Sequence, residues 1–477
     1  MTLHVFNTSP TSIAVDSRQV RQGSLFLAYP GEKADGRQYI QDAIQNGAVA
    51  VLWEPDGFDW NAAWSVENLP VKNLRTQAGL IADRFYGHPS RQLWVVAVTG
   101  TNGKTSISQW VAQALSYLER KTAVIGTIGN GFPDALTATH NTTPGAVSLH
   151  GLLADYLQLG AQGVAMEVSS HGLDQGRLNG VHFDVAVLSN LTRDHLDYHG
   201  TMENYAAAKR KLFEMSDLKA AVINIDDEFG RQLQHAMLNK PLQVMTYGIG
   251  AGDVRASNIR LRSSHLSFRV HTPAGEAEVV AAVVGQFNVY NVLAVLATLL
   301  VSDVKLTDAV DAISHIKSVS GRMEQMGGGD QPSVVVDYAH TPDALENVLK
   351  ALRIQTKGKL VCVFGCGGDR DPGKRALMGK VVSELADAAV VTSDNPRSED
   401  PEAIIQQVLE GMHGSYAIEP DRAKAISVAI HAAQAGDTVL IAGKGHENYQ
   451  EINGKKVYFS DVEQAKSALK RLQGVAV

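Results

Sequence analysis

The residues whose types and spacing best suit chemistry lie in the segment VVAVTGTNGKTS, residues 95–106. Its apolar, β-branched start predicts a buried strand that ends at a glycine-rich turn, and a helix is expected to begin at Lys104. Such a turn binds phosphate through backbone N–H groups, while the lysine adds positive charge and Thr105 offers a hydroxyl to Mg²⁺. A standard phosphate loop has glycine where Val98 stands, so this loop is a variant. A turn without a nucleotide would leave the Lys-Thr pair unexplained, so we predict nucleotide binding.

Ionisable side chains follow the next two predicted strands. Strand 163–166 runs into Glu167, and strand 185–188 runs into the segment NLTRDHLDYHG, which contains His195. Parallel strands end at one edge of a sheet, so these groups are expected near the phosphate loop, where an acidic residue commonly anchors Mg²⁺. Any one of these histidines alone is more often structural than a ligand, but their shared position favours metal and phosphate chemistry.

Other candidate residues lie on or before predicted helices. Lys209 belongs to the helical segment YAAAKRKLF, where a lysine is usually solvated, so its spacing alone does not mark it as catalytic. Asn288 and Asn291 lie three residues apart at the start of an apolar helix, where amides could hydrogen-bond a purine edge. The segment 141–143 precedes another helix and fits either ordinary capping or a group of neutral donors to a ligand.

The last third of the chain predicts a second doubly wound sheet, because four strand segments alternate with helices. The expected strands are 333–337, 360–365, 388–392 and 438–442. Ionisable residues follow each of them, in the segments DYAH, GGDR, DNPR and GKGHE. This sheet has no phosphate loop of its own, so we expect it to bind a different ligand.

Length and composition indicate a soluble protein that is long enough for several domains. The 477 residues are 44% hydrophobic and 19% charged, and no apolar run is long enough to span a membrane. No basic region followed by an apolar stretch opens the chain, so we expect no secretory signal and a cytoplasmic location. The net charge of −7 argues against broad binding to nucleic acid. The two cysteines, Cys362 and Cys366, are expected to be reduced and structural.

The predicted fold class is α/β with three domains, at residues 1–87, 88–319 and 320–477. The first is a small α/β domain with strands near residues 13–15, 24–28 and 48–52 and a helix at 39–44. The second is a central parallel sheet with the phosphate loop, followed by antiparallel strands in 251–285, and the third is Rossmann-like. In the first domain, Ser17 follows a strand, where a ligand contact and an ordinary surface turn are both open.

Ten motifs in order resemble the Mur ligases along the whole chain, and within them the enzymes that add the third residue of the peptidoglycan stem peptide. The motifs are TGTNGKT, EVSSHGL, NLTRDHLDYHG, YAAAK, GQFNVYN, GRME, VDYAHTPDALE, GCGGDRD, DNPR and GKGHE. The resemblance implies a UDP-binding N-terminal domain, a central ATP-binding domain and a C-terminal amino-acid-binding domain. It implies that ATP phosphorylates the D-glutamate carboxylate of UDP-MurNAc-L-Ala-D-Glu. The amine of a diamino acid then displaces phosphate, in a cytoplasmic, monomeric enzyme of cell-wall biogenesis.

The same resemblance implies a role for individual residues. Lys104 would contact the β- and γ-phosphates, and two Mg²⁺ ions would be held by Thr105, Glu167, His195 and a CO₂-derived carbamate on Lys209. The nucleotide contacts would be Gly100, Thr101, Asn102, Gly103, Asn288, Asn291, Arg322, Asp337 and His340. The UDP-muramyl-dipeptide contacts would be Ser17, Asn141, Thr142, Thr143, Ser169, Gln175 and Arg177. The amino-acid contacts would be Arg370, Asp394, Asn395, Arg397, Gly443 and Glu447.

The amino acid is expected to be meso-diaminopimelate rather than L-lysine, since the two differ by a distal carboxylate. Arg397 and Arg370 follow neighbouring strands, and a guanidinium suits a carboxylate, while Glu447 would bind the distal ammonium. The alternative for Arg397 is a surface pair with Glu399 or Asp400.

Other functions compete with this interpretation. A folylpolyglutamate synthetase or another Mur ligase would share the loop variant, but the DNPR and GCGGDRD motifs argue against both. A P-loop kinase or motor ATPase would not need a second α/β domain whose four strands each end in ionisable residues, so that domain argues against both. A non-catalytic nucleotide-binding scaffold would tolerate loss of Glu167, His195 or Lys209, and all three are present.

Overall fold

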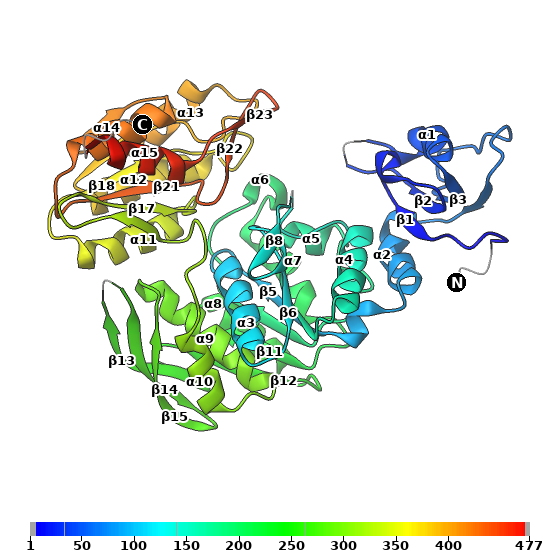
Figure 1. Cartoon of the computed structure of the whole chain (residues 1–477), viewed down its shortest axis with the longest axis horizontal. Helices are drawn as coiled ribbons and strands as arrows, with labels where there is room; N and C mark the ends of the chain where they lie inside the picture. Colours follow the sequence, from blue (N-terminus) through cyan, green and yellow to red (C-terminus); the bar gives the residue numbers. More distant parts are fainter. Residues whose placement is uncertain (1–5, 33, 140, 263, 473–477) are drawn as a thin grey trace. The chain divides into compact units, whose positions relative to one another are not determined.

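The computed structural model describes residues 6–32, 34–139, 141–262 and 264–472. The chain forms two compact units. The first comprises Met1–Val96, Arg120–Asp184 and Met215–Leu218, and the second comprises Ala97–Glu119, Val185–Glu214 and Lys219–Val477. Strand β5 (Trp94–Thr99) begins in the first unit and ends in the second. Figure 1 shows the order of the elements along the chain.

The N-terminal part of the first unit is a small parallel sheet with a helix on each face. Its strands are β1 (Ser12–Ala14), β2 (Ser24–Ala28), β3 (Ala48–Trp53) and β4 (Glu67–Pro70), in that order. Alternate side chains of β2 point to opposite faces: Leu25 and Leu27 pack with α2 (Leu74–Phe85), while Phe26 packs with α1 (Ile40–Gln45). Both faces of the sheet are therefore buried, which explains its short, apolar strands.

The rest of the first unit positions the loops that follow β6 and β9. Strand β6 (Thr122–Ile125) lies parallel to β9 (Gly163–Glu167), and the short strands β7 (Asn130–Phe132) and β8 (Ala135–Thr137) follow antiparallel. Helix α4 (Ala146–Gln158) precedes β9, and the short helix α5 (Ser170–Asp174) follows it. Glu167 is the last residue of β9, as the sequence predicts.

In the second unit, helix α3 (Lys104–Tyr117) starts directly after the glycine-rich turn. Strands β10 (Val185–Leu188), β11 (Ala220–Asn224) and β12 (Gln243–Gly248) run parallel, and β13 (Val254–Leu261), β14 (Leu266–Thr272) and β15 (Gly275–Ala281) continue the sheet, with antiparallel β13–β14 and β14–β15 pairs. Helices α6 (Leu196–His199), α7 (Met202–Phe213), α8 (Glu228–Met237), α9 (Gln286–Val301) and α10 (Leu306–Ser314) connect or cover these strands.

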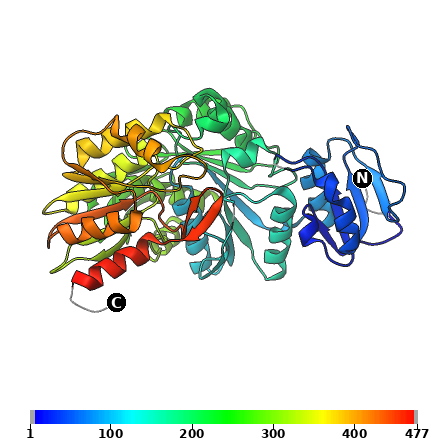
Figure 2. The same cartoon turned by 90° about the horizontal axis from the view of Figure 1, so that it is seen from above.

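The C-terminal sheet has the order β16-β17-β21-β18-β19-β20, with only β16 antiparallel to its neighbour. Its strands are β16 (Glu324–Gly327), β17 (Ser333–Asp337), β18 (Leu360–Phe364), β19 (Ala388–Val391), β20 (Tyr416–Ile418) and β21 (Thr438–Ala442). One face packs against α11 (Pro342–Gln355), α12 (Gly373–Leu385) and α13 (Pro401–Leu409). The other packs against α14 (Arg422–Ala432) and α15 (Asp461–Leu472), which Figure 2 shows in orange and red.

The structure confirms the predicted α/β fold class, and it also contains short strands that the sequence did not predict. The four strands predicted in the last third are β17, β18, β19 and β21, whereas β16, β20 and the hairpin of β22 (Tyr449–Ile452) and β23 (Lys455–Tyr458) were not predicted. These edge strands are short and mostly exposed, so they carry little of the apolar pattern on which the prediction relied.

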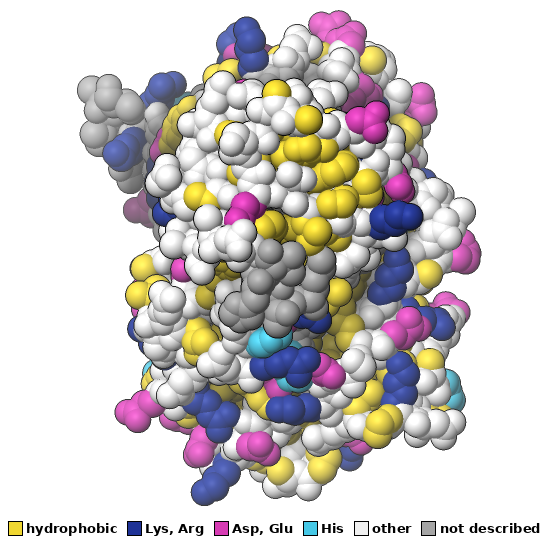
Figure 3. Space-filling view, turned by 90° about the vertical axis from the view of Figure 1, so that its right-hand side faces the viewer, with side chains coloured by type: hydrophobic (Ala, Val, Ile, Leu, Met, Phe, Trp, Pro, Cys, Tyr) yellow, Lys and Arg dark blue, Asp and Glu magenta, His cyan; other side chains and the backbone are white. Residues whose placement is uncertain are grey.

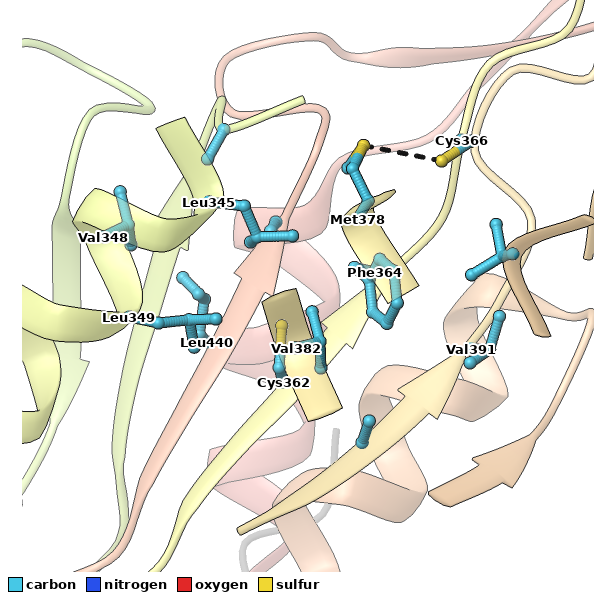
Figure 4. Packing of buried hydrophobic residues seen from close by; sticks show 14 of the residues in the cluster. Leu345, Val348, Leu349, Cys362, Phe364, Cys366, Met378, Val382, Val391 and Leu440 are labelled. Atoms are coloured by element: carbon cyan, nitrogen blue, oxygen red, sulfur yellow. Dashed lines mark hydrogen bonds between the residues drawn. The ribbon is translucent and has the colours of Figure 1, made fainter. Parts of the chain in front are cut away.

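Both cysteines are free and buried, as expected. Cys362 and Cys366 belong to the core between the C-terminal sheet and α11–α13, where Cys366 Sγ lies 3.6 Å from Met378 Sδ (Figure 4). Burial raises the pKa of the Cys366 thiol to about 12, so it is protonated at neutral pH. These thiols therefore fill the core and are not nucleophiles.

No helix in the described part of the chain is long and apolar enough to cross a membrane. On the face drawn in Figure 3, Lys and Arg side chains are interspersed with Asp and Glu side chains.

A fully buried ion pair fixes the starts of α14 and α15 against the end of β21. Arg422 Nε and Nη2 donate to the two Asp461 oxygens at 2.8 and 2.7 Å, and Nη2 also donates to Ala442 O at 2.9 Å. Arg422→Met should lower the free energy of unfolding by about 3–5 kcal/mol, because Asp461 would be left buried and unpaired. Urea unfolding measures this, and Lys424→Met, which removes an exposed pair with Asp421, should cost less than about 1 kcal/mol. Equal effects of the two substitutions would contradict the prediction.

Candidate functional site

The glycine-rich turn is locked in shape by the end of β10. Asn190 accepts from Thr101 N through its carbonyl and from Asn102 N through Oδ1, both at 2.9 Å. Gly100 has a φ of +147°, and a Cβ there would lie 1.9 Å from Ser189 Oγ, so only glycine fits. The turn therefore keeps a fixed backbone that directs it into the N-terminus of α3, the arrangement that suits a phosphate group.

Two lysine ammonium groups meet at one carbonyl oxygen of this turn. Lys104 Nζ donates to Gly100 O at 3.0 Å and to Thr101 O at 2.8 Å, and Lys209 Nζ donates to Gly100 O at 2.8 Å. Lys209 is completely buried on α7, with Nζ 4.4 Å from the centre of the Tyr205 ring. Burial, and then the nearby charge of Lys104, hold the pKa of Lys209 well below its usual value. The surroundings of Lys209 thus make its ammonium group lose a proton more easily than it would in water.

A buried carboxylate, Asp194, gathers cationic groups from distant segments. His195 Nε2 lies 3.4 Å from Asp194 Oδ2, His340 Nε2 lies 3.6 Å from the same oxygen, and Lys374 Nζ lies 3.5 Å from Oδ1. Despite burial, His340, His195 and Lys374 hold the pKa of Asp194 well below its ordinary value. The predicted residues His195 and His340 are therefore brought together through a carboxylate that the sequence analysis did not select.

Arg322 reaches the start of α3. Its Nη2 donates to Thr105 Oγ1 at 3.0 Å, and its guanidinium lies 4.3 Å from the centre of the Tyr338 ring. Asp337 is buried and accepts from Met323 N and Ala339 N, both at 2.8 Å, and burial raises its pKa. As placed, Asp337 holds the loops that carry Arg322 and His340.

The two predicted purine-site amides bond to each other at the start of α9. Asn291 Nδ2 donates to Asn288 Oδ1 at 2.8 Å, and Asn288 Nδ2 donates to Val284 O at 2.7 Å. A Cβ on Gly103 would lie 2.5 Å from Asn291 Oδ1, so this amide packs directly against the phosphate loop. Asn102, in the loop itself, donates to Asp343 Oδ2 at 2.8 Å.

The first unit holds a second group of predicted residues around Glu167. Glu167 Oε1 accepts from Thr127 N at 2.7 Å and Oε2 from Thr127 Oγ1 at 3.0 Å, and Thr127 Oγ1 lies 3.0 Å from Thr142 Oγ1. Thr143 Oγ1 donates to Glu167 O and accepts from Ser169 N. Thr127 follows β6 and was not selected from the sequence, where nothing marked it as a partner of Glu167.

The remaining predicted contacts of the first unit are spread over several loops. Arg177 donates to Thr143 O and to Gln175 Oε1, both at 2.8 Å, and so belongs to the group around Glu167. Asn141 O accepts from Thr139 Oγ1 in the loop before α4. Ser17 is buried in the turn after β1, where its carbonyl accepts from Asn46 Nδ2 at 2.9 Å.

The predicted amino-acid residues converge beyond β19 and β21. Asp394, Asn395 and Glu447 surround the ammonium of Lys444, which was not selected from the sequence. Arg397 has a φ of +52° and is held by the β22–β23 hairpin, since its N–H donates to Glu451 O and its carbonyl accepts from Asn453 N.

The guanidinium of Arg397 does not form the surface pair considered above. Its Nη1 donates to Gly368 O at 2.6 Å and its Nε lies 3.6 Å from Glu451 Oε2, while Glu399 instead binds Arg375. A Cβ on Gly367 would lie 2.8 Å from Arg397 Nη1 and 3.9 Å from Arg370 Cγ, so both arginines approach this glycine. Arg370 itself is exposed and donates to Asp369 O. Gly443 has a φ of +117° beside Asp394.

Among the residues that the structure describes, no three His, Cys, Asp or Glu side chains lie close enough together to hold a metal ion. Any Mg²⁺ bound here would therefore need hydroxyl, carbamate or phosphate oxygens as additional ligands.

Three family models match successive parts of the chain. The Mur ligase family catalytic domain matches residues 10–86, the Mur ligase middle domain matches 98–299, and the Mur ligase glutamate ligase domain matches 321–445. The chain belongs to the Mur ligase family, as the resemblance of its motifs predicts.

Several relatives of high identity carry the same name. The UDP-N-acetylmuramoyl-L-alanyl-D-glutamate–2,6-diaminopimelate ligase of Chromobacterium violaceum is 54% identical, over 96% of this chain and 94% of the relative. The protein of that name from Neisseria meningitidis serogroup A is 48% identical, over 98% and 96%. A solved structure with this name is 39% identical, with a TM-score of 0.69, over 97% and 95%. MurF of Thermotoga maritima, at 18% identity over 97% of each chain and a TM-score of 0.70, shares the fold.

The lowered pKa of Asp194 gives a prediction for stability. The pKa of Asp194 is well below the ordinary value of 3.8 for an aspartate, so the ionised carboxylate stabilises the fold at neutral pH, and this contribution is lost as the pH falls through the folded-state pKa. Asp194→Asn should therefore lower the free energy of unfolding by about 2–3 kcal/mol at pH 7, and the difference should shrink below pH 4. Urea unfolding of both proteins at several pH values measures this, and a difference that does not vary with pH would contradict it.

Proposed function

We propose that this chain is an ATP-dependent ligase that joins meso-2,6-diaminopimelate to UDP-MurNAc-L-Ala-D-Glu in peptidoglycan biosynthesis. The observation that carries the proposal is the pairing of opposite charges at one edge of the C-terminal sheet. There, Arg397 and Glu447 are linked through Asn395 and Glu451. A guanidinium and a carboxylate held apart by the protein suit the distal carboxylate and ammonium of a diamino dicarboxylic acid. The names of the most similar relatives support the same substrate.

The reaction has two steps. The γ-phosphate of ATP is transferred to the D-glutamate carboxylate, which forms an acyl phosphate and ADP. The neutral amine of diaminopimelate then attacks the acyl carbon, so that the C–N bond forms and the bond between the acyl carbon and the phosphate oxygen breaks. Inorganic phosphate leaves, and the nitrogen releases one proton to the phosphate or to water. Positioning and neutralisation of charge suffice for both steps, so no strongly shifted general base is required.

We assign the nucleotide to the phosphate loop of the second unit. Gly100, Thr101, Asn102 and Gly103 would surround the phosphates, with Lys104 and Arg322 supplying positive charge. His340 would contact the γ-phosphate from its position beside Asp194, and Asp337 would act by holding this loop. Asn288 and Asn291 would line the adenine side.

The residues present suit Mg²⁺ and a carbamate. Thr105 offers a hydroxyl at the start of α3 and Glu167 a carboxylate, while His195 and Lys209 would serve the second ion. Because the buried amine of Lys209 favours its neutral form, it can react with CO₂ and become an oxyanion. When bound, the two ions neutralise charge on the transferring phosphoryl group.

We assign the UDP-muramyl-dipeptide to the first unit. Ser17 would contact the uridine, and the hydroxyl and amide groups of the loop before α4 and around β9 would contact the muramyl peptide. The residues of the second group are Asn141, Thr142, Thr143, Ser169, Gln175 and Arg177. The proposal includes domains at 1–87, 88–319 and 320–477 and a monomeric, cytoplasmic enzyme.

Loss of Lys209 gives the first test of this mechanism. Lys209→Ala should reduce ligation by at least about 100-fold, because the oxyanion would be missing, and acetate should restore part of the activity by occupying its position. Phosphate release in rising acetate concentration measures this, with Lys211→Ala on the same helix as the control. Full activity of Lys209→Ala, or equal rescue of the control, would contradict the assignment.

Selection of the amino acid tests the proposed substrate directly. Phosphate release from ATP with the UDP-MurNAc-dipeptide should require a diamino acid, and kcat/KM for meso-diaminopimelate should exceed that for L-lysine by about 10⁴-fold. Arg397→Ala should raise KM for diaminopimelate and narrow this advantage, because the guanidinium would contact the distal carboxylate, which L-lysine lacks. Similar kcat/KM values for the two amino acids in the unmodified enzyme would overturn the substrate assignment.

A further inference from the structure

The buried cation of the C-terminal sheet, Lys444, has no role in the function proposed above. It follows β21, and its side chain is completely buried. Its Nζ donates to Asn395 Oδ1 at 3.0 Å and lies 3.3 Å from Glu447 Oε2 and 3.4 Å from Asp394 Oδ1. A buried ammonium is costly unless its surroundings compensate it, and here three side chains assigned to the amino acid do so.

Lys444 determines which end of the Asn395 amide faces Glu447. Asn395 Oδ1 accepts from Lys444 Nζ and from Glu451 N, both at 3.0 Å, and Nδ2 donates to Glu447 Oε2 at 2.9 Å. A flipped amide would place its NH₂ group against two other donors. The orientation seen here is therefore the one that the lysine and the hairpin backbone allow.

The same contacts leave one face of Glu447 toward the exterior of the site. Within the described residues, both side-chain hydrogen bonds of Glu447 use Oε2, and 17% of the side chain is exposed. Oε1 is thus the oxygen that can accept a hydrogen bond from a ligand. Its position depends on the two groups that hold Oε2.

We infer that Lys444 is a positioning residue that presents the Glu447 carboxyl group to the distal ammonium group of the diamino-acid substrate. The inference rests on the proposed function. Lys444 itself does not touch the ligand, because its ammonium is enclosed by Asp394, Asn395 and Glu447.

The groups around Glu447 explain why replacing Lys444 by a neutral residue should weaken binding of the diamino acid. Besides Lys444, the groups that interact electrostatically with Glu447 are the guanidinium of Arg422 and the phenols of Tyr338 and Tyr449. Lys444 Nζ lies 3.4 Å from Asp394 Oδ1 and 3.3 Å from Glu447 Oε2, so without it the two carboxylates would lose the cation that they share. Glu447 Oε2 would also lose one of its two hydrogen-bond partners, and Oε1 would no longer be held in one position.

The test compares two amino acids that differ only in the distal amine. Phosphate release is measured for the full-length enzyme and Lys444→Met, at saturating ATP and UDP-MurNAc-dipeptide, with meso-diaminopimelate or with 2-aminopimelate, which keeps the distal carboxylate. Lys444→Met should raise KM for diaminopimelate at least about tenfold while kcat changes less than about threefold. KM for 2-aminopimelate and for ATP should stay within about twofold, because neither uses Glu447. The matched control is Lys424→Met, which removes an exposed lysine of α14 and should behave as the unmodified enzyme.

Each outcome bears on the inference. Equal losses with both amino acids would overturn it, because Lys444 would then support the site only as part of the fold. Lys444→Gln, which keeps a hydrogen-bond donor, should give an intermediate KM, and unfolding of both variants in thermal denaturation would also overturn the inference. If the unmodified enzyme released no phosphate with diaminopimelate, the proposed function would fail and the inference with it. A normal unmodified enzyme with unchanged KM in Lys444→Met would overturn the inference alone.

Discussion

Two ammonium groups share the carbonyl oxygen of Gly100, and the second unit is arranged to hold them together. Like charges in a buried site repel strongly, because little water screens them. The structure reduces this cost with the carbonyls of Gly100 and Thr101, the ring face of Tyr205 and the negative charge of Asp194. The remaining cost falls on Lys209, whose pKa is lowered. The rigid turn, the buried α7 and the end of β10 are all needed to keep this arrangement.

Polar contacts connect this region to the C-terminal sheet. Asp194 contacts His340 and Lys374, and Arg322 donates to Thr105. In addition, Arg193 pairs with Asp371, and Asn102 donates to Asp343. Polar interfaces of this kind separate more readily than apolar cores. Contacts that converge on the phosphate loop therefore suit domains that close over substrates and exclude water from a reactive acyl phosphate.

The sequence predicted the buried strands and the ends of those strands well, because both follow from local patterns. Short apolar runs separated by helical segments identified β17, β18, β19 and β21, and the glycine-rich turn identified the start of α3. Asp194, Lys374 and Lys444 were not selected, since their importance lies in partners 50 to 180 residues away. Conversely, His195 and His340 were selected separately, and only the fold revealed the carboxylate between them.

The hairpin of β22 and β23 shows a second reason why the sequence alone does not predict the whole site. Strands β22 and β23 are half-buried or exposed, so no apolar alternation marks them, yet they hold Arg397 in a left-handed conformation that few arginines adopt. Backbone hydrogen bonds to residues 451 and 453 compensate the cost of that conformation. The DNPR motif identifies Arg397 as a candidate, but the conformation of this arginine depends on backbone groups of the hairpin about 55 residues further along the chain.

The two candidate ligand regions differ in their charge balance, and this difference follows the chemistry of the proposed substrates. Around the phosphate loop, Lys104 and Arg322 supply positive charge close to the backbone N–H groups of the turn, which suits a phosphate ligand. Beyond β19 and β21, the two cations Lys444 and Arg397 lie among three carboxylates, those of Asp394, Glu447 and Glu451. A site with fixed charges of both signs suits a zwitterion whose own charges lie at the matching separation better than it suits a polyanion. The charges of the two regions therefore agree with the two different ligands that we propose for them.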